Sequence, residues 1–197
     1  LRFLGRQAML GLKQGLASVT RLPGFEFDEL ETFESSKCKP LSVALAVVPG
    51  TRKILGFEVA VMPCKGPLTS LALRRYGYRP DQRGRALDNL FRRIAPSISQ
   101  PPRIRSDQNP RYPRYVNRHF PNGRHLTFEG RRGCVTGQGE LKRGGWDPLF
   151  SLNHTFAMLR ANVNRLVRKT WCTTKKAESL SDHLAIYAKY HNDVLTL

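Results

Sequence analysis

Residues 25–34 read FEFDELETFE, and the alternation within this stretch decides how the chain can fold. Phe25, Phe27 and Phe33 share one parity, whereas Asp28 has the other. An alternation of period two predicts a strand, with Asp28 facing away from the three rings. The same stretch holds five of the fifteen Asp and Glu residues in a chain whose formal net charge is +18. This concentration of carboxylates in one predicted strand of a basic protein requires a structural or functional explanation.

The flanking sequence predicts further strands and helices around this first strand. LSVALAVV is nearly all apolar, as in a buried central strand, and ILGFEVAVM follows it after a turn, which predicts a hairpin. The predicted strands are 25–34, 41–48, 54–62, 103–107 and 125–130, and the predicted helices are 1–20, 83–95, 148–170 and 177–191. Residues 63–80 show neither pattern and predict irregular structure. This order predicts a three-layer α/β domain, in which a mixed sheet has helices on both faces.

The composition predicts a nucleic-acid partner. Lys and Arg number 33 against 15 Asp and Glu, and the sequence pI is about 10.5, an excess that usually accompanies a polyanion. The plain alternative is a soluble surface, although a smaller net charge would provide that. At 197 residues and 40% hydrophobic, the chain can form one ordinary core.

Two other classes of protein are not indicated. No run of about 18 apolar residues occurs, so no membrane-spanning helix is predicted and we expect a cytoplasmic protein. Cys38, Cys64, Cys134 and Cys172 are far apart and form no CxxC pair, which predicts neither a zinc site nor a disulfide scaffold.

The acids of the first strand suggest a metal site. A carboxylate in this strand and another at the end of a later strand can meet across neighbouring strands, where they repel unless a cation lies between them. Mg²⁺ is the natural occupant, and two such ions about 4 Å apart can promote phosphoryl transfer. In the alternative interpretation, the acids only pair with basic residues or protect an edge strand from aggregation. Spacing alone favours this alternative.

The C-terminal third, from Leu152 to Asn192, resembles the end of the catalytic domain in bacterial insertion-sequence transposases of the DDE type, closest to the branch typified by the first-numbered insertion sequence. The matching pieces are Arg165-Leu166, Arg168-Lys169-Thr170, Thr173-Thr174-Lys175-Lys176 and Tyr190-His191-Asn192. SDQNPRYPRYVNRHFP (106–121) resembles the second-acid segment of that family, and FDELETF resembles its first-acid strand. The resemblance covers about residues 25–193 and implies a ribonuclease-H-like fold.

The resemblance implies that Asp28 and Asp107 are catalytic aspartates that bind Mg²⁺ or Mn²⁺. The third acid of the family falls on Asn153, which is neutral and would bind a metal through its carbonyl oxygen alone. Three interpretations stay open at this position: a working Asp-Asp-Asn site, a decayed and inactive copy, or a shifted alignment in which Asp147 or Glu140 supplies the acid.

Several basic and polar residues are candidates for binding DNA. They are Arg160, Asn164, Arg165, Arg168, Lys169, Lys175 and Lys176. On helical spacing, Asn153, Arg160, Asn164 and Arg168 share a face that could follow a DNA backbone away from the site. Further candidates are the basic, Gly-rich segment 130–145, Trp171, and the segment from Arg74 to Arg79. For each of them the alternative is an ordinary role in the surface or the core.

The resemblance also gives expectations for the whole protein. Residues 1–22 are expected to be the remnant of an N-terminal module or a linker helix, and 23–197 the catalytic domain. The expected activity is DNA cleavage and strand transfer on transposon ends and target DNA, by a homo-oligomer associated with the nucleoid. The alternatives are a decayed or non-enzymatic nucleic-acid-binding protein and a ribonuclease-H-like nuclease without strand transfer.

Overall fold

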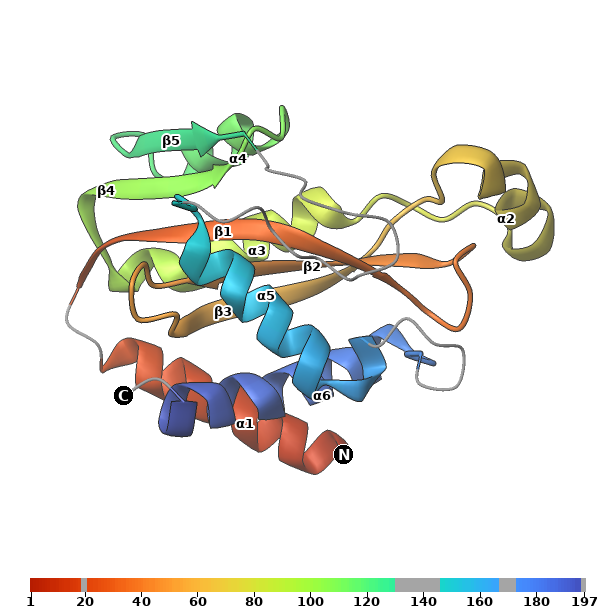
Figure 1. Ribbon diagram of the computed structural model, residues 1–197, viewed down its shortest axis with the longest axis horizontal. Helices are drawn as coiled ribbons and strands as arrows, with labels where there is room; N and C mark the ends of the chain where they lie inside the picture. The colour runs from red at the N-terminus through yellow and green to blue at the C-terminus, as the bar shows by residue number, and fades with distance from the viewer. Residues whose placement is uncertain (19–20, 130–145, 167–172, 196–197) are drawn as a thin grey trace.

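The computed structural model describes residues 1–18, 21–129, 146–166 and 173–195. Within these ranges the chain forms one five-stranded sheet, in the order β3-β2-β1-β4-β5 (Figure 1). The strands are β1 (Leu22–Phe33), β2 (Pro40–Val47), β3 (Ile54–Val61), β4 (Ile98–Asp107) and β5 (Arg124–Phe128). β1, β2 and β3 form an antiparallel meander, whereas β4 pairs parallel to β1 and β5 parallel to β4. The predicted mixed sheet is therefore confirmed.

Helices cover both faces of this sheet. The helices are α1 (Arg2–Ala17), α2 (Thr69–Tyr76), α3 (Arg83–Ile94), α4 (Tyr112–His119), α5 (Phe150–Asn162) and α6 (Ala177–Tyr190), with short turns η1 (Gly66–Leu68), η2 (Ala95–Ser97), η3 (Asn164–Leu166) and η4 (His191–Leu195). α5 and α6 pack on one face, and α3 and α4 pack on the other. α1 lies beside α6 (Figure 1). The origin of residues 1–22 in another module stays a prediction.

The parity of β1 divides its side chains between the two layers. Phe25 and Phe27 are fully buried among the residues of α3 and α4, whereas Leu30 packs with α5 and α6. Asp28 has the parity of Leu30 and therefore belongs to the α5 face, as the alternation predicts. Each buried ring contributes roughly 2–3 kcal/mol by leaving water. The aromatic residues thus fix the orientation of the whole strand.

β4 begins earlier than the sequence predicts. It starts at Ile98 and continues through Pro101 and Pro102, which lie between the pairs Leu22↔Ile98 and Gly24↔Arg103 where the register shifts. Proline removes a ladder donor, and an interrupted ladder tolerates that loss. A side chain at Gly24 would clash with the carbonyl oxygen of Arg103, so glycine permits the close approach of the two strands.

The predicted helix 148–170 is wrong at both ends. α5 begins at Phe150, because the Asp147 side chain accepts a hydrogen bond from Leu149 N–H and forms a turn before it. It ends at Asn162, where Val163 takes an extended conformation and buries its side chain. Asn164 consequently lies in η3, so the predicted helical face does not continue from Asn153 and Arg160 to Asn164. Arg168, the last residue of that predicted face, lies outside the described residues.

Two further helices were not predicted. Residues 63–80 contain η1 and α2, but α2 buries only Ala72, so its sequence carries almost no apolar period. α4 follows β4 closely and begins with Tyr112-Pro113, which is a favourable start for a helix because proline is tolerated in the first turn.

Candidate active site

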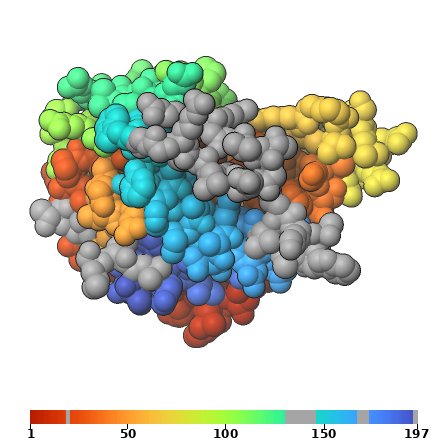
Figure 2. Space-filling view, in the orientation of Figure 1, coloured from red at the N-terminus to blue at the C-terminus, as the bar shows by residue number. Residues whose placement is uncertain are grey.

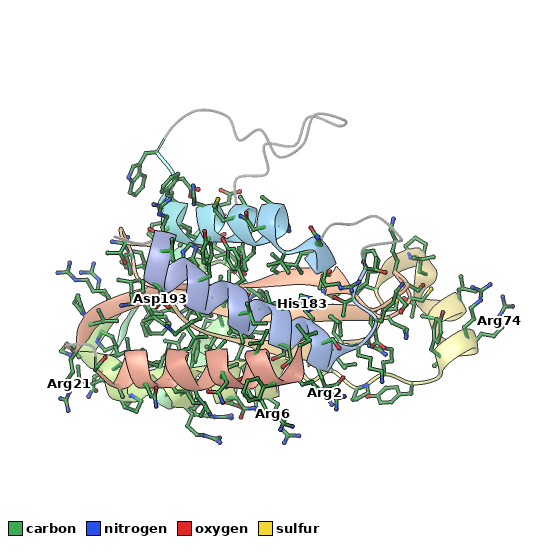
Figure 3. The ribbon with its side chains drawn as sticks, turned by 90° about the horizontal axis from the view of Figure 1, so that it is seen from below. Arg2, Arg6, Arg21, Arg74, His183 and Asp193 are labelled. Carbon is green, nitrogen blue, oxygen red and sulfur yellow. The ribbon has the colours of Figure 1, made fainter. Side chains whose placement is uncertain are left out.

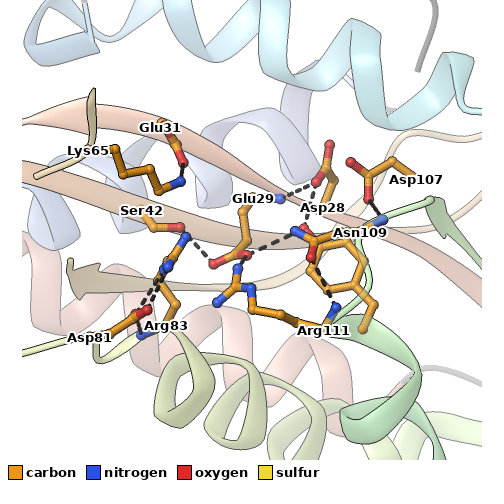
Figure 4. A network of polar contacts seen from close by, with 11 residues as sticks. Asp28, Glu29, Glu31, Ser42, Lys65, Asp81, Arg83, Asp107, Asn109 and Arg111 are labelled. Carbon is orange, nitrogen blue, oxygen red and sulfur yellow. Dashed lines mark hydrogen bonds and ion pairs between the residues drawn. The ribbon is translucent and has the colours of Figure 1, made fainter. Parts of the chain in front are cut away.

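The register of β1 and β4 brings two predicted catalytic acids together. Glu26 pairs with Arg105, and the same register extended by two residues sets Asp28 beside Asp107, the last residue of β4. Neighbouring strands lie about 4.8 Å apart, and residues opposite each other in a parallel pair share a face. Figure 4 shows the two carboxylates side by side. The structure therefore brings Asp28 and Asp107 to one place.

Most acids of the first strand are neutralised by basic residues. The ion pairs are Glu26–Arg105, Glu29–Arg111, Glu31–Lys65, Glu34–Lys39 and Glu34–Arg79. The pairing alternative is thus confirmed for these glutamates, whereas edge protection is wrong because β1 is the central strand. Within the described ranges, neither Asp28 nor Asp107 forms an ion pair. These two aspartates are therefore the acids that pairing leaves unexplained.

Neutral donors hold one oxygen of each aspartate. Asp28 Oδ1 accepts hydrogen bonds from Glu29 N–H at 2.6 Å and from the Tyr112 hydroxyl at 2.8 Å, and Asp107 Oδ1 accepts one from Asn109 N–H at 3.0 Å (Figure 4). The Tyr112 ring is fully buried, with its centroid 4.8 Å from that of Phe27. No described residue donates to the Oδ2 atom of either aspartate. Both carboxylates are therefore oriented while each keeps one oxygen for another ligand.

The proximity of the two acids changes the protonation of Asp28. Burial, and after it the negative charge of Asp107, raises the pKa of Asp28 from its ordinary 3.8 to about 7. The hydrogen bonds from Glu29 N–H and Tyr112 lower it, but they do not compensate. A cation between the carboxylates would remove this conflict, since an opposite charge favours the ionised form.

Glu26 connects the acid pair to the first turn of α5. Its side chain is 2% exposed, and its Oε2 atom accepts a hydrogen bond from Leu152 N–H at 3.1 Å. Burial raises the Glu26 pKa, whereas the Leu152 N–H group and the Arg105 guanidinium lower it. An N–H group in the first turn of a helix has no intrahelical partner, so Glu26 acts as a cap supplied by the sheet. The cap holds the start of α5 against β1, two residues from Asp28.

Asn153 lies in this first turn, and among the described residues it forms no hydrogen bond with Asp28 or Asp107. Its side-chain amide donates to Asp147 Oδ2 at 2.9 Å. Asp147 is itself close enough to Glu26 for its charge to raise the Glu26 pKa. Two of the three candidates for the third ligand, Asn153 and Asp147, thus lie at the start of α5, whereas Glu140 is outside the described residues. In the described part of the chain, no group of three or more His, Cys, Asp or Glu residues could hold a metal ion.

Those predicted DNA-binding residues that the structure describes lie toward the far end of β1. Arg160 is half-buried in the last turn of α5, Asn164 is exposed, and Arg165 donates to the carbonyl of Thr173 at 3.5 Å. Lys175 and Lys176 are exposed, whereas Arg168, Lys169 and Trp171 are outside the described residues, as is the segment 130–145. Thr174 bridges to Glu34, which is six residues beyond Asp28, or about 20 Å along an extended strand.

Sequence reasoning missed the residues that support the acid pair. Tyr112, Arg111 and Glu26 were not predicted to act here, although a Tyr-Pro pair belongs to the segment that resembles the transposase family. The Tyr-Pro pair could therefore have pointed to Tyr112. The partners of Glu26 and Glu29 depend on strand register and on the turn after β4, which no local pattern reveals.

Comparisons with known proteins add little to this geometry. No family model matches the chain, and no curated protein matches it. One similar solved structure is the catalytic domain of Mos1 mariner transposase, with 11% sequence identity over 97% of this chain and 87% of that chain and a TM-score of 0.43. A similarity this low does not assign the chain to a family, and it gives no support to a particular insertion-sequence branch. The described residues contain no helix long and apolar enough to cross a membrane.

We expect the metal-free protein to lose stability as the pH rises from about 4 to about 7. The folded chain keeps the Asp28 proton up to a pKa of about 7, whereas the unfolded chain releases it near 3.8. Between these values the folded state binds more protons, so a rise in pH favours unfolding. Asp28→Asn removes this titration and should stabilise the protein above pH 7, with an upper bound of about 4 kcal/mol.

Urea unfolding in a chelator at about pH 5 and pH 8 measures this difference. Glu178→Gln is the matched control, because Glu178 is exposed in the first turn of α6 and its loss should leave the wild-type pH dependence in place. The explanation fails if Asp28→Asn has the same pH dependence as the wild type.

Proposed function

We propose that this chain cleaves DNA and transfers DNA strands in a metal-dependent reaction, as a DDE-type transposase. The observation that supports the proposal is the pair of Asp28 and Asp107, which lacks a cationic partner in the described part of a chain with net charge +18. Such a pair is costly in a folded protein and is useful where a cation must be held. A basic protein that binds DNA needs a local negative site of this kind to attract a metal ion to the phosphate.

Asp28 and Asp107 would hold Mg²⁺ or Mn²⁺, and their chemistry fits, because hard divalent cations prefer carboxylate oxygens. The bound metal would stabilise charge on the phosphate and activate the attacking oxygen. Asn153 is the proposed third ligand through its carbonyl oxygen. Its amide nitrogen bonds to Asp147, which leaves that oxygen available.

The other residues of the site prepare these ligands. Tyr112 and Glu29 N–H orient Asp28, so its carboxylate does not have to be ordered when a ligand arrives. The raised pKa of Asp28 means that its proton must leave when a cation binds. Glu26 fixes the start of α5, which carries Asn153.

DNA is the proposed partner, as transposon ends and as target. The residues proposed to contact its backbone are Arg160, Asn164, Arg165, Arg168, Lys169, Lys175 and Lys176. Binding through phosphates would be sequence-independent and would weaken steeply with salt. A homo-oligomer on DNA, location in the cytoplasm at the nucleoid, and membership of a bacterial insertion-sequence branch belong to the same proposal.

A decayed or non-enzymatic DNA-binding protein is the second candidate. It is favoured by one observation, that no third His, Cys, Asp or Glu residue completes a metal site with the pair within the described residues. This candidate requires DNA binding without divalent metal and without cleavage, so the two candidates differ in one assay.

The assay is nicking and strand transfer of supercoiled DNA in Mg²⁺ or Mn²⁺. We expect activity in the wild type and its loss, on the order of a thousandfold or more, in Asp28→Asn and in Asp107→Asn, because each removes a charged ligand worth several kcal/mol. DNA binding should persist in both variants. Cleavage by either variant at the wild-type rate would show that the pair is not catalytic, and no cleavage by any of the proteins would favour the second candidate.

The role of Asn153 is tested by replacing its amide with a carboxylate and by removing the amide. A carboxylate at this position adds a unit charge, worth on the order of 4 kcal/mol at about 4 Å before desolvation reduces it. Asn153→Glu should therefore lower the Mg²⁺ concentration for half-maximal cleavage by roughly tenfold, and Asn153→Ala should abolish cleavage. Asn162→Ala is the control, since Asn162 is exposed at the other end of α5 and its amide donates to Met158. If both Asn153 variants behave as the wild type, Asp147 or Glu140 is the better third ligand.

A further inference from the structure

A short arm leaves the sheet between β3 and α3. It comprises residues 63–80, here called the α2 arm, and contains η1 and α2. In Figure 1 it stands away from the layers of the domain, and in Figure 2 it forms a separate knob (yellow). Its large apolar side chains are poorly covered: Leu73 is 58% exposed and Tyr78 is 81% exposed. Several exposed apolar side chains in one short segment can mark an interaction surface.

The arm carries only positive charge. The sequence contains no Asp or Glu between Glu58 and Asp81, whereas the arm holds four basic residues, Lys65, Arg74, Arg75 and Arg79. Tyr76 and Tyr78 lie among them. The absence of acids over the whole segment means that the arm cannot neutralise itself.

Two of these basic residues attach the arm to acids in β1 and directly after it. Lys65 forms an ion pair with Glu31 at 2.7 Å, and Arg79 forms one with Glu34 at 3.7 Å. The Lys39 ammonium also lies 5.4 Å from the centre of the Tyr76 ring. The arm is therefore held in a defined position relative to the strand that carries Asp28.

The other two basic residues are presented to solvent. Arg74 and Arg75 are exposed in the last turn of α2, and neither forms an ion pair with a described residue. Figure 3 shows Arg74 at the outermost end of the molecule. Two exposed guanidinium groups beside exposed Leu73 and Tyr78 match a partner that offers both anionic and apolar surface. The backbone of DNA offers phosphates and the apolar faces of deoxyribose.

We propose that the α2 arm binds the backbone of duplex DNA outside the active site, with Arg74 and Arg75 on phosphates. This inference rests on the proposed function. The arm is attached at Glu31 and Glu34, three and six residues from Asp28, or about 10–20 Å along β1. At about 3.4 Å per base pair, its contact would therefore lie roughly three to six base pairs or more from the reacting phosphate. It would add affinity without reading sequence.

A second copy of this chain is a poorer occupant for the arm. In a twofold interface the same patch meets itself, so Arg74 and Arg75 of two copies would approach each other. The arm has no acid with which to pair them. Like charges placed together in this way oppose association.

The test measures binding of a duplex of about 40 base pairs by fluorescence anisotropy, at several salt concentrations and without divalent metal. All proteins carry Asp28→Asn, so binding is measured independently of cleavage. The arm variant carries Arg74→Ala and Arg75→Ala. The matched control carries Arg85→Ala and Arg92→Ala, two exposed arginines of α3 on the opposite face of the sheet from α5. A third protein, with Arg74→Lys and Arg75→Lys, keeps the charge of the arm.

We expect the arm variant to lose roughly 10- to 60-fold in affinity at about 0.1 M salt, and its log–log salt slope to fall by about 1.8, because two phosphate contacts are lost. The control and the lysine variant should stay within about threefold of the parent protein. Equal losses in the arm variant and the control would overturn the inference, since they would reflect net charge alone. Loss of self-association with unchanged DNA affinity would assign the arm to a second copy and would also overturn it.

These outcomes are distinct from a failure of the proposed function. A parent protein that binds no duplex would overturn both the DNA partner and the role of the arm. If the parent protein binds DNA through the arm but the wild type does not cleave DNA, the inference is supported and the catalytic proposal is rejected.

Discussion

Electrostatic repulsion between Asp28 and Asp107 is the constraint around which this domain is organised. The central position of β1 and its parallel register with β4 force the two carboxylates together on one face. Burial and the mutual repulsion of the two charges raise the pKa of Asp28 to about 7. In a protein selected for stability alone, a basic or an apolar residue would replace one of the two aspartates, because either replacement would remove the repulsion between their charges. This unrelieved repulsion is the reason why we propose a cation between the two carboxylates.

The other acids of β1 attach surrounding elements to the pair. Glu26 accepts a hydrogen bond from the first turn of α5 and forms an ion pair with Arg105 of β4. Glu29 forms an ion pair with Arg111 in the turn before α4. Glu31 and Glu34 hold the α2 arm. One acidic strand therefore positions a helix carrying Asn153, the segment carrying Tyr112, and a cationic arm. The concentration of carboxylates in a basic chain therefore has two explanations: most of them are structural anchors, and Asp28 with Asp107 forms the site that we propose to be catalytic.

The sequence was informative wherever a local period determines the structure. Alternation predicted β1 and the position of Asp28 on the face opposite the Phe rings, apolar runs predicted the hairpin of β2 and β3, and helical spacing predicted α3 and α6. The end of α5 was not predictable, because the apolar stripe continues through Val163 and Leu166 although the backbone leaves the helix. The partners of Glu26 and Glu29 depend on long-range register. The contact of Asn153 with Asp147 depends on the turn before α5, and the catalytic roles themselves remain predictions.

Direct measurement of Mn²⁺ binding tests the central claim, that the acid pair is a metal site. Electron paramagnetic resonance at about pH 8 would count bound ions in the wild type, in Asp28→Asn and in Asp107→Asn, without any need for DNA or activity. The claim predicts that the wild type binds Mn²⁺ and that each variant binds it more weakly by roughly a hundredfold, since each loses one unit of negative charge at the site. Equal binding by the three proteins, or no binding by the wild type at millimolar Mn²⁺, would contradict it.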